Sequence, residues 1–339
     1  MKLWWRIAGI SLLFSLRAWG QPEPRDLPTF KARSEEVLLD VLALDRKTGR
    51  PVGHLRPGDF RLSEDGIAQP LTSFSQDELP LSVVLLFDLT DTVRPVLKPL
   101  AAGARAVLEH LKRGDEVAVM VFSSSAQLLQ DFTTDRGLAA HAVAQASRME
   151  SRDATFLNED LFEAVGQARS ARSPNSRRVL VWLTDGTANT PSDEMRWQHG
   201  MMAPAYLHTE KEATRDLLAS GAVVTAVIEE SDLTEQEVAR TRFQPMEMLM
   251  RHAFPPGDIR RFAELTGGIV LSSSAKQTSA RLAALLDEIR SRYTLGYRPL
   301  MQRPAGTFCS IQLQLTPEAA ARLGKITLRT RAGYYRSGP

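Results

Sequence analysis

The chain has 339 residues, of which 43% are hydrophobic, and its 42 lysines and arginines against 40 aspartates and glutamates give a formal net charge of +2 at pH 7. This length accommodates one large domain or two ordinary ones, and the hydrophobic fraction is that of a globular protein. Because the basic residues are scattered and nearly balanced by acidic ones, charge gives no reason to expect nucleic acid or an anionic membrane as a partner.

The first 20 residues have the layout of a secretory signal peptide. Lys2 and Arg6 precede an apolar run at 7–16, and Ala18-Trp19-Gly20 supplies small residues for cleavage. The run is too short to cross a bilayer as an ordinary transmembrane helix, and no second long apolar run follows. We therefore expect a secreted, periplasmic or cell-envelope protein with no transmembrane segment beyond the signal peptide. An uncleaved anchor is the alternative.

Residues 21–34 are rich in proline and charge, which predicts a flexible lead-in. Between 35 and 78 the pattern indicates β-strands. A strand at 36–44 is followed by one that enters the Asp65-Gly66 turn, a strong hairpin signal, and we expect 69–74 to return as its partner. These strands are too few to be stable alone.

From residue 79 to residue 292 strand patterns and helix patterns alternate. This order predicts an α/β domain with a doubly wound, mostly parallel, Rossmann-like sheet. Within the expected helix at 136–149, Leu138, Val143 and Ala146 have the spacing of core-facing residues. The expected strands are 83–87, 116–123, 127–131 (antiparallel), 179–183, 222–228 and 269–271, and the other expected helices are 96–111, 156–171, 209–219, 256–265 and 279–292.

The pattern returns to β after residue 292, with expected strands at 292–297, 307–315 and 325–331. We expect residues 293–339 and 35–78 to share one small antiparallel β-sandwich, into which the α/β domain is inserted. Cys309 is the only cysteine and lies in an alternating run, so we expect a buried strand thiol and no internal disulfide.

A polar cluster follows the first α/β strand. Asp88, Thr90 and Thr92 alternate directly after the apolar run at 81–87, so one carboxylate and two hydroxyls can face a single point. Ligands of open α/β sheets bind at this end of the strands, and oxygen donors suit a hard cation such as Mg²⁺. The alternative is a helix N-terminus capped by Thr92 or Asp91.

Two later stretches extend this pattern. Asp153-Ala154-Thr155 precedes an expected helix, and Thr184-Asp185-Gly186 ends a second buried strand. Together with 88–92 they resemble the metal-ion-dependent adhesion site (MIDAS) of von Willebrand factor A (VWA) domains. The resemblance implies a ligand set of Asp88, Thr90, Thr92, Thr155 and Asp185. The chain departs from the family pattern in having Thr at both Ser positions and Arg152-Asp153-Ala154 where Gly-Gly is common.

The β segments on either side resemble a narrower group, the bacterial "VWFA-related domain" family of exported proteins. The resemblance is carried by the leader around Glu64-Asp65-Gly66, by Tyr293-x-Leu295-Gly296-Tyr297, and by the terminal Arg331-x-Gly333-Tyr334-Tyr335.

A site of this kind binds and does not catalyse. Mg²⁺ is the expected ion, with Mn²⁺ or Ca²⁺ as alternatives, and few direct carboxylates leave it a residual positive charge and an open position. The resemblance implies that a partner protein fills this position with an Asp or Glu, as in adhesion or scaffolding. The expected partner-binding rim consists of Asp91, Asp153, Trp197, His199, Met201 and Tyr206.

Two other functions stay open. The segment from Asp88 to Thr92 also resembles haloacid-dehalogenase-type phosphotransferases, which implies Asp88 as the nucleophile. The other alternative is a metal-independent structural scaffold in which the β-sandwich carries the interaction.

Overall fold

The computed structural model describes residues 36–76, 79–90, 93–123, 125–149, 151, 156–173, 175–186, 208–229, 259–274 and 276–336. They all belong to one compact unit, Glu35–Pro339. The expected signal peptide and lead-in, residues 1–34, lie outside the described residues. Among the helices of the described ranges, none has the length and apolar character needed to cross a membrane.

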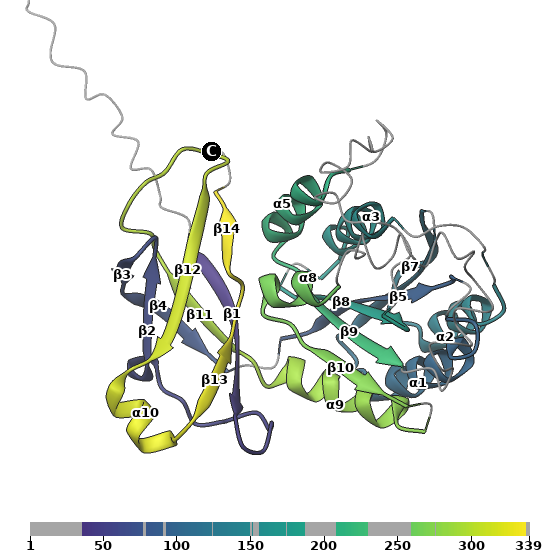
Figure 1. The fold of residues 1–339 in the computed structure, drawn as a ribbon, viewed down its shortest axis with the longest axis horizontal. Helices are drawn as coiled ribbons and strands as arrows, with labels where there is room; N and C mark the ends of the chain where they lie inside the picture. The colour runs from purple at the N-terminus through teal and green to yellow at the C-terminus, as the bar shows by residue number, and fades with distance from the viewer. Residues whose placement is uncertain are drawn as a thin grey trace, which may run out of the picture. The chain divides into compact units, whose positions relative to one another are not determined.

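A six-stranded sheet forms the centre of the α/β part (Figure 1). Every neighbouring pair of strands is parallel except β6 and β7, which are antiparallel. The expected doubly wound, mostly parallel sheet is therefore confirmed. In order across the sheet the strands are β10 (Val270–Ser273), β9 (Val223–Glu229), β8 (Arg177–Thr184), β5 (Leu81–Asp88), β6 (Glu116–Phe122) and β7 (Ala126–Thr133).

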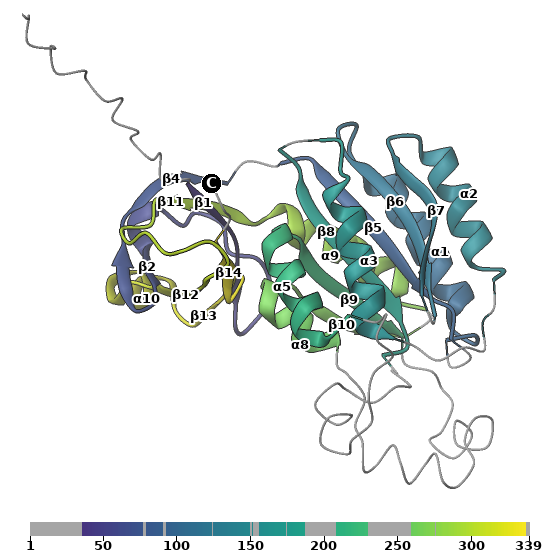
Figure 2. The ribbon, with the colours of Figure 1, turned by 90° about the horizontal axis from the view of Figure 1, so that it is seen from above.

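Helices cover both faces of this sheet (Figure 2). One face packs on α1 (Leu97–His110), α2 (Arg136–Ala146) and α9 (Thr278–Arg290). The other packs on α3 (Leu157–Arg169), α5 (Glu210–Ser220) and α8 (Ile259–Thr266).

Strand β5 lies in the middle of this arrangement. Val83, Leu85 and Phe87 point into the first helix layer, whereas Val84 and Leu86 point into the second. Because successive side chains of a strand face opposite sides, a strand covered on both faces needs an unbroken apolar run. That requirement explains why β5 has no polar residue between Val83 and Phe87 and why its first carboxylate comes only at its end.

The remaining strands form two four-stranded sheets. Each sheet combines strands from before and after the α/β part, as expected for a β-sandwich with an inserted domain. Tyr293, Tyr297, Leu39, Phe60 and the buried Cys309 lie in its core. One sheet has the order β13 (Ile326–Arg329), β1 (Val37–Asp45), β11 (Tyr293–Tyr297), β4 (Leu71–Ser75), and the other β14 (Gly333–Tyr335), β12 (Phe308–Leu315), β2 (Phe60–Glu64), β3 (Ile67–Gln69).

Two local predictions were wrong. The hairpin turn at Asp65-Gly66 forms, but the partner of β2 is β3, and the chain beyond Pro70 crosses to the other sheet as β4. Proline lacks the N–H that a continuous ladder needs, which accounts for the break. In α2, Leu138 is 51% exposed, because the small residues Ala139 and Ala142 form the buried face instead. A short helix α10 (Pro317–Leu323) was not expected.

Candidate metal centre

Asp88 is the last residue of β5 and lies at the carboxyl end of the sheet. Only 2% of its surface is exposed. The Oδ1 atom accepts two hydrogen bonds from Thr90, one from the backbone N–H at 2.8 Å and one from the hydroxyl at 2.7 Å. These bonds fold the chain back at the end of β5 and hold the Thr90 hydroxyl against the carboxylate.

Strand β8 brings a second carboxylate to the same place. It is the parallel neighbour of β5, with Leu183 opposite Phe87. The Thr184 hydroxyl donates to Oδ2 of Asp88 at 2.7 Å, and Asp185 lies close enough for its charge to raise the pKa of Asp88. Gly186 then turns the chain with φ +73°, a conformation that disfavours residues with a side chain.

Helix α3 contributes a third carboxyl group, that of Asp160. This residue lies in the first turn of the helix and is completely buried. Neither of its oxygens has a hydrogen-bond partner among the described residues, and the charge of Asp88 acts on it directly. A buried carboxyl group without a partner is costly, so its retention at this position needs an explanation.

The surroundings of these groups disfavour negative charge. Burial raises the pKa of Asp88 to about 6, and Asp185 adds to the increase, whereas hydrogen bonds from Thr184 and Thr90 oppose it. Burial likewise raises the pKa of Asp160 well above its usual range, with Asp88 as the next cause. Neutralisation by a proton or by a cation would relieve this repulsion.

Of the five expected ligands, the structure therefore brings Asp88, Thr90 and Asp185 together. Thr92 and Thr155 lie outside the described residues, as do the expected rim residues Asp91, Asp153, Trp197, His199, Met201 and Tyr206.

The described neighbours of Thr155 are attached to the ends of the central strands. The N–H of Ser151 donates to the carbonyl of Leu89 at 3.1 Å, and that of Phe156 donates to the carbonyl of Ser123 at 3.4 Å. Leu89 directly follows Asp88 at the end of β5. Ser123 directly follows Phe122, the residue of β6 that pairs with Asp88.

Asp160 and Thr184 were missed by the sequence prediction. Asp160 nevertheless has the spacing of an inward-facing helical residue, since it lies between the buried residues Leu157 and Ala164. Thr184 immediately precedes Asp185 and ends its strand, where a hydroxyl can reach the neighbouring strand end.

A second group of possible metal ligands lies in the β-sandwich, where Glu64, Asp65 and Cys309 approach one another. Glu64 already accepts hydrogen bonds from the hydroxyls of Tyr297 and Tyr334, and burial raises the pKa of the Cys309 thiol. The two tyrosine hydroxyls satisfy the Glu64 carboxylate within a buried polar network of the sandwich core, so its burial is explained without a metal ion.

The residues at the end of β5 fit a hard divalent cation. Carboxylate and hydroxyl oxygens are the donors that Mg²⁺, Mn²⁺ and Ca²⁺ prefer. The buried oxygens of Asp160, which have no hydrogen-bond partner among the described residues, are acceptors that such a cation would satisfy.

Comparison with known proteins agrees with this geometry. The family model for the von Willebrand factor type A domain matches residues 83–187, which run from β5 to just beyond Asp185. A search of curated proteins returns no significant match.

Several solved structures resemble the chain at low identity. An aerotolerance-related membrane protein from Bacteroides fragilis is 15% identical, with 62% of this chain and 98% of that one covered and a TM-score of 0.41. A von Willebrand factor type A protein from Catenulispora acidiphila is 13% identical, with 91% and 75% covered and a TM-score of 0.42. The PilB minor pilin from Streptococcus sanguinis is 12% identical, with 64% and 63% covered and a TM-score of 0.39.

Domains of this class generally serve as protein-interaction modules. The order of strands and helices around β5, the oxygen donors at its carboxyl end and the match over residues 83–187 lead to one assignment. The chain is a protein with a von Willebrand factor type A domain.

Proposed function

We propose that this protein is an exported, divalent-cation-dependent protein-binding module for adhesion or scaffolding. Its MIDAS-type site would use Asp88, Thr90, Thr92, Thr155 and Asp185 to hold Mg²⁺, with Mn²⁺ or Ca²⁺ as alternatives, and to capture an Asp or Glu of a partner protein. The proposed organisation is a signal peptide at 1–20, a lead-in at 21–34, sandwich segments at 35–78 and 293–339, and the VWA domain at 79–292.

One observation carries the proposal: the buried carboxyl groups of Asp88 and Asp160 lie close together, the partly exposed Asp185 lies beside Asp88, and Asp160 has no hydrogen-bond partner among the described residues. Like charges in a buried place repel strongly, and a divalent cation removes that repulsion. A bound ion with an open position would act as the electrostatic anchor for an acidic side chain.

Two threonines orient the carboxylate of Asp88. Thr90 and Thr184 hold the Asp88 carboxylate through three hydrogen bonds, so its orientation is fixed before a ligand arrives. Since those bonds engage both oxygens of Asp88, they favour a supporting role for this carboxylate over attack on a phosphoryl group. The phosphotransferase alternative would require turnover of a phosphate ester or a trapped acyl-phosphate on Asp88.

The melting temperature of the purified protein tests the proposal. Mg²⁺ or Mn²⁺ should raise it relative to EDTA, because a ligand of the native state stabilises that state. Asp88→Ala and Asp185→Ala should abolish the increase, and Asp287→Ala, at an exposed position of α9, should not. An increase that survives both site variants would reject the site, and partner binding that survives EDTA would favour the metal-independent scaffold.

A further inference from the structure

One end of the β-sandwich carries a group of exposed apolar side chains. Strand β11 ends there at Tyr297, a loop of residues 298–307 follows, and β12 starts back at Phe308 (Figure 1). Isolated exposed apolar residues are common on protein surfaces. Among the described residues, however, seven large apolar side chains are exposed, and four of them lie at this end: Ile67, Leu300, Met301 and Phe308. Such grouping indicates a contact surface.

Leu300 and Met301, here called the loop tip, are the centre of this group, and 63% and 44% of their surfaces are exposed. The loop is nevertheless attached to β3. The N–H of Leu300 donates to Oε1 of Gln69 at 3.1 Å, and Nε2 of the same Gln69 donates to the carbonyl of Ile67 at 3.3 Å. The tip is therefore displayed on a backbone that is held in place, with Ile67 beside it.

Two arginines flank the loop tip. Arg298 precedes it and is exposed, and Arg303 follows it with 37% of its side chain exposed. Arg303 also attaches the loop to the turn between β2 and β3, through an ion pair with Asp65 of 3.4 Å. An apolar tip between cationic side chains suits the interface of a bilayer, where apolar groups reach the acyl chains and guanidinium groups contact anionic headgroups.

The N-terminal part of the chain enters the sandwich at the same end. Strand β1 begins at Val37, which lies opposite Tyr297, so Glu36 is beside the start of the loop. Residues 17–35 connect this point to the apolar run at 7–16. They span at most about 60 to 70 Å when fully extended. As long as the apolar run is held in a membrane, the chain therefore keeps the loop tip within that distance of the bilayer, which raises its effective concentration there.

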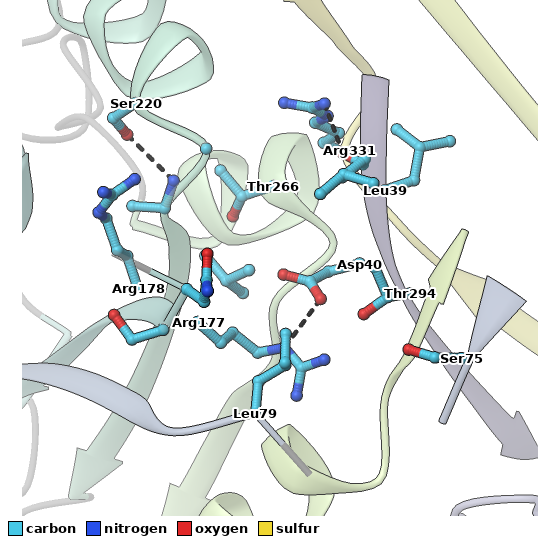
Figure 3. Close-up of a pocket in the computed structure, with 16 residues that line it drawn as sticks. Leu39, Asp40, Ser75, Leu79, Arg177, Arg178, Ser220, Thr266, Thr294 and Arg331 are labelled. Atoms are coloured by element: carbon cyan, nitrogen blue, oxygen red, sulfur yellow. Dashed lines mark hydrogen bonds and ion pairs between the residues drawn. The ribbon is translucent and has the colours of Figure 1, made fainter. Parts of the chain in front are cut away.

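A cavity elsewhere in the described residues offers no comparable surface. It has a volume of about 480 Å³, and β1, β11 and β8 contribute to its lining (Figure 3). Leu38, another exposed apolar residue, belongs to this lining. The guanidinium groups of Arg177, Arg178 and Arg331 point apart in Figure 3, so one ligand group cannot engage all three.

We propose that the loop end of the sandwich docks on the surface of an anionic lipid bilayer, with Leu300 and Met301 inserted among the lipids and Arg298 and Arg303 at the headgroups. Insertion of so few apolar side chains gives weak and reversible attachment. The docking surface shares no residue with the proposed cation site, so this attachment should not require a divalent cation.

Sedimentation with lipid vesicles tests this surface, in EDTA so that the cation site does not contribute. Residues 1–20 lie outside the compact unit Glu35–Pro339, so protein without them keeps the described fold and lacks the apolar run. It should bind vesicles of equal parts phosphatidylglycerol and phosphatidylcholine, and it should bind pure phosphatidylcholine more weakly. Leu300→Ser combined with Met301→Ser should weaken binding at least about fivefold, with an unchanged circular dichroism spectrum. Leu138→Ser, at a position of α2 that is 51% exposed, should leave binding unchanged.

A dye attached at the loop tip reports insertion directly. Cys309 is buried, so a thiol-reactive dye should label Leu300→Cys selectively at the new position. The emission of an environment-sensitive dye should shift to shorter wavelength on anionic vesicles, and the same dye on Leu138→Cys should not shift. No binding to either kind of vesicle, or full binding by the double variant, would overturn the proposal. Self-association that the double variant abolishes, without vesicle binding, would also overturn it, because the occupant would then be a second copy of the chain.

Discussion

The carboxyl group of Asp160 should destabilise the cation-free protein. It is completely buried, and an unsatisfied buried polar group costs about 1 to 3 kcal/mol. Replacement by alanine also gains about 0.6 kcal/mol of helix propensity, and it loses about 0.3 to 1 kcal/mol of interaction with the α3 dipole. We therefore expect Asp160→Ala to stabilise the protein in EDTA by about 1 to 3 kcal/mol.

The same substitution should weaken the response to a cation, because it removes negative charge from the site. Urea unfolding in EDTA and in saturating Mg²⁺ measures both effects on one protein. Glu163→Ala, at an exposed position of the same helix, is the matched control and should change neither value by more than about 0.5 kcal/mol. If Asp160→Ala destabilises the protein in EDTA and keeps the full Mg²⁺ response, the inference about Asp160 is wrong.

Three further predictions concern protonation and packing. In EDTA, raising the pH from about 4 to above 6 should lower the free energy of unfolding by about 3 kcal/mol through Asp88, because its pKa rises from 3.8 to about 6 on folding; Asp88→Asn should remove this slope from a urea titration series. Tyr297→Phe should lower the free energy of unfolding by about 1 to 3 kcal/mol in the same assay, because the hydroxyl that it removes donates a hydrogen bond to the buried carboxylate of Glu64. An unchanged free energy of unfolding would contradict that role. Gly268→Ala should abolish folding or lower the free energy of unfolding by more than about 3 kcal/mol, because its Cβ would lie 1.7 Å from a carbonyl oxygen of β9. Gly166→Ala, where the Cβ meets open space in α3, should instead stabilise the protein by about 0.5 to 1 kcal/mol. Circular dichroism on heating distinguishes the two outcomes.

The central sheet and part of the site could be predicted because both depend on short stretches of sequence. The apolar run before Asp88 and the one before Asp185 each show a strand buried on two faces. Parallel strands in one sheet end at the same edge, so the polar residues that follow them converge without any knowledge of the packing.

Other features depend on how distant segments pack. Asp160 lies beside Asp88 only because α3 turns its buried face, with Leu157 and Leu161, toward the end of β5. An isolated helix pattern does not show which strand end its first turn approaches. Arg177 and Arg331 likewise line one cavity, although no sequence periodicity relates these positions.

The position of a bound Mn²⁺ ion tests the central claim most directly. Crystals of the protein grown with MnCl₂ would reveal the ion by its anomalous scattering. We predict a peak at the carboxyl end of β5, within coordination distance, about 2 to 2.5 Å, of oxygens from the group that contains Asp88, Thr90 and Asp185. A peak at Glu64 and Asp65 instead, or no peak at saturating Mn²⁺, would contradict the account.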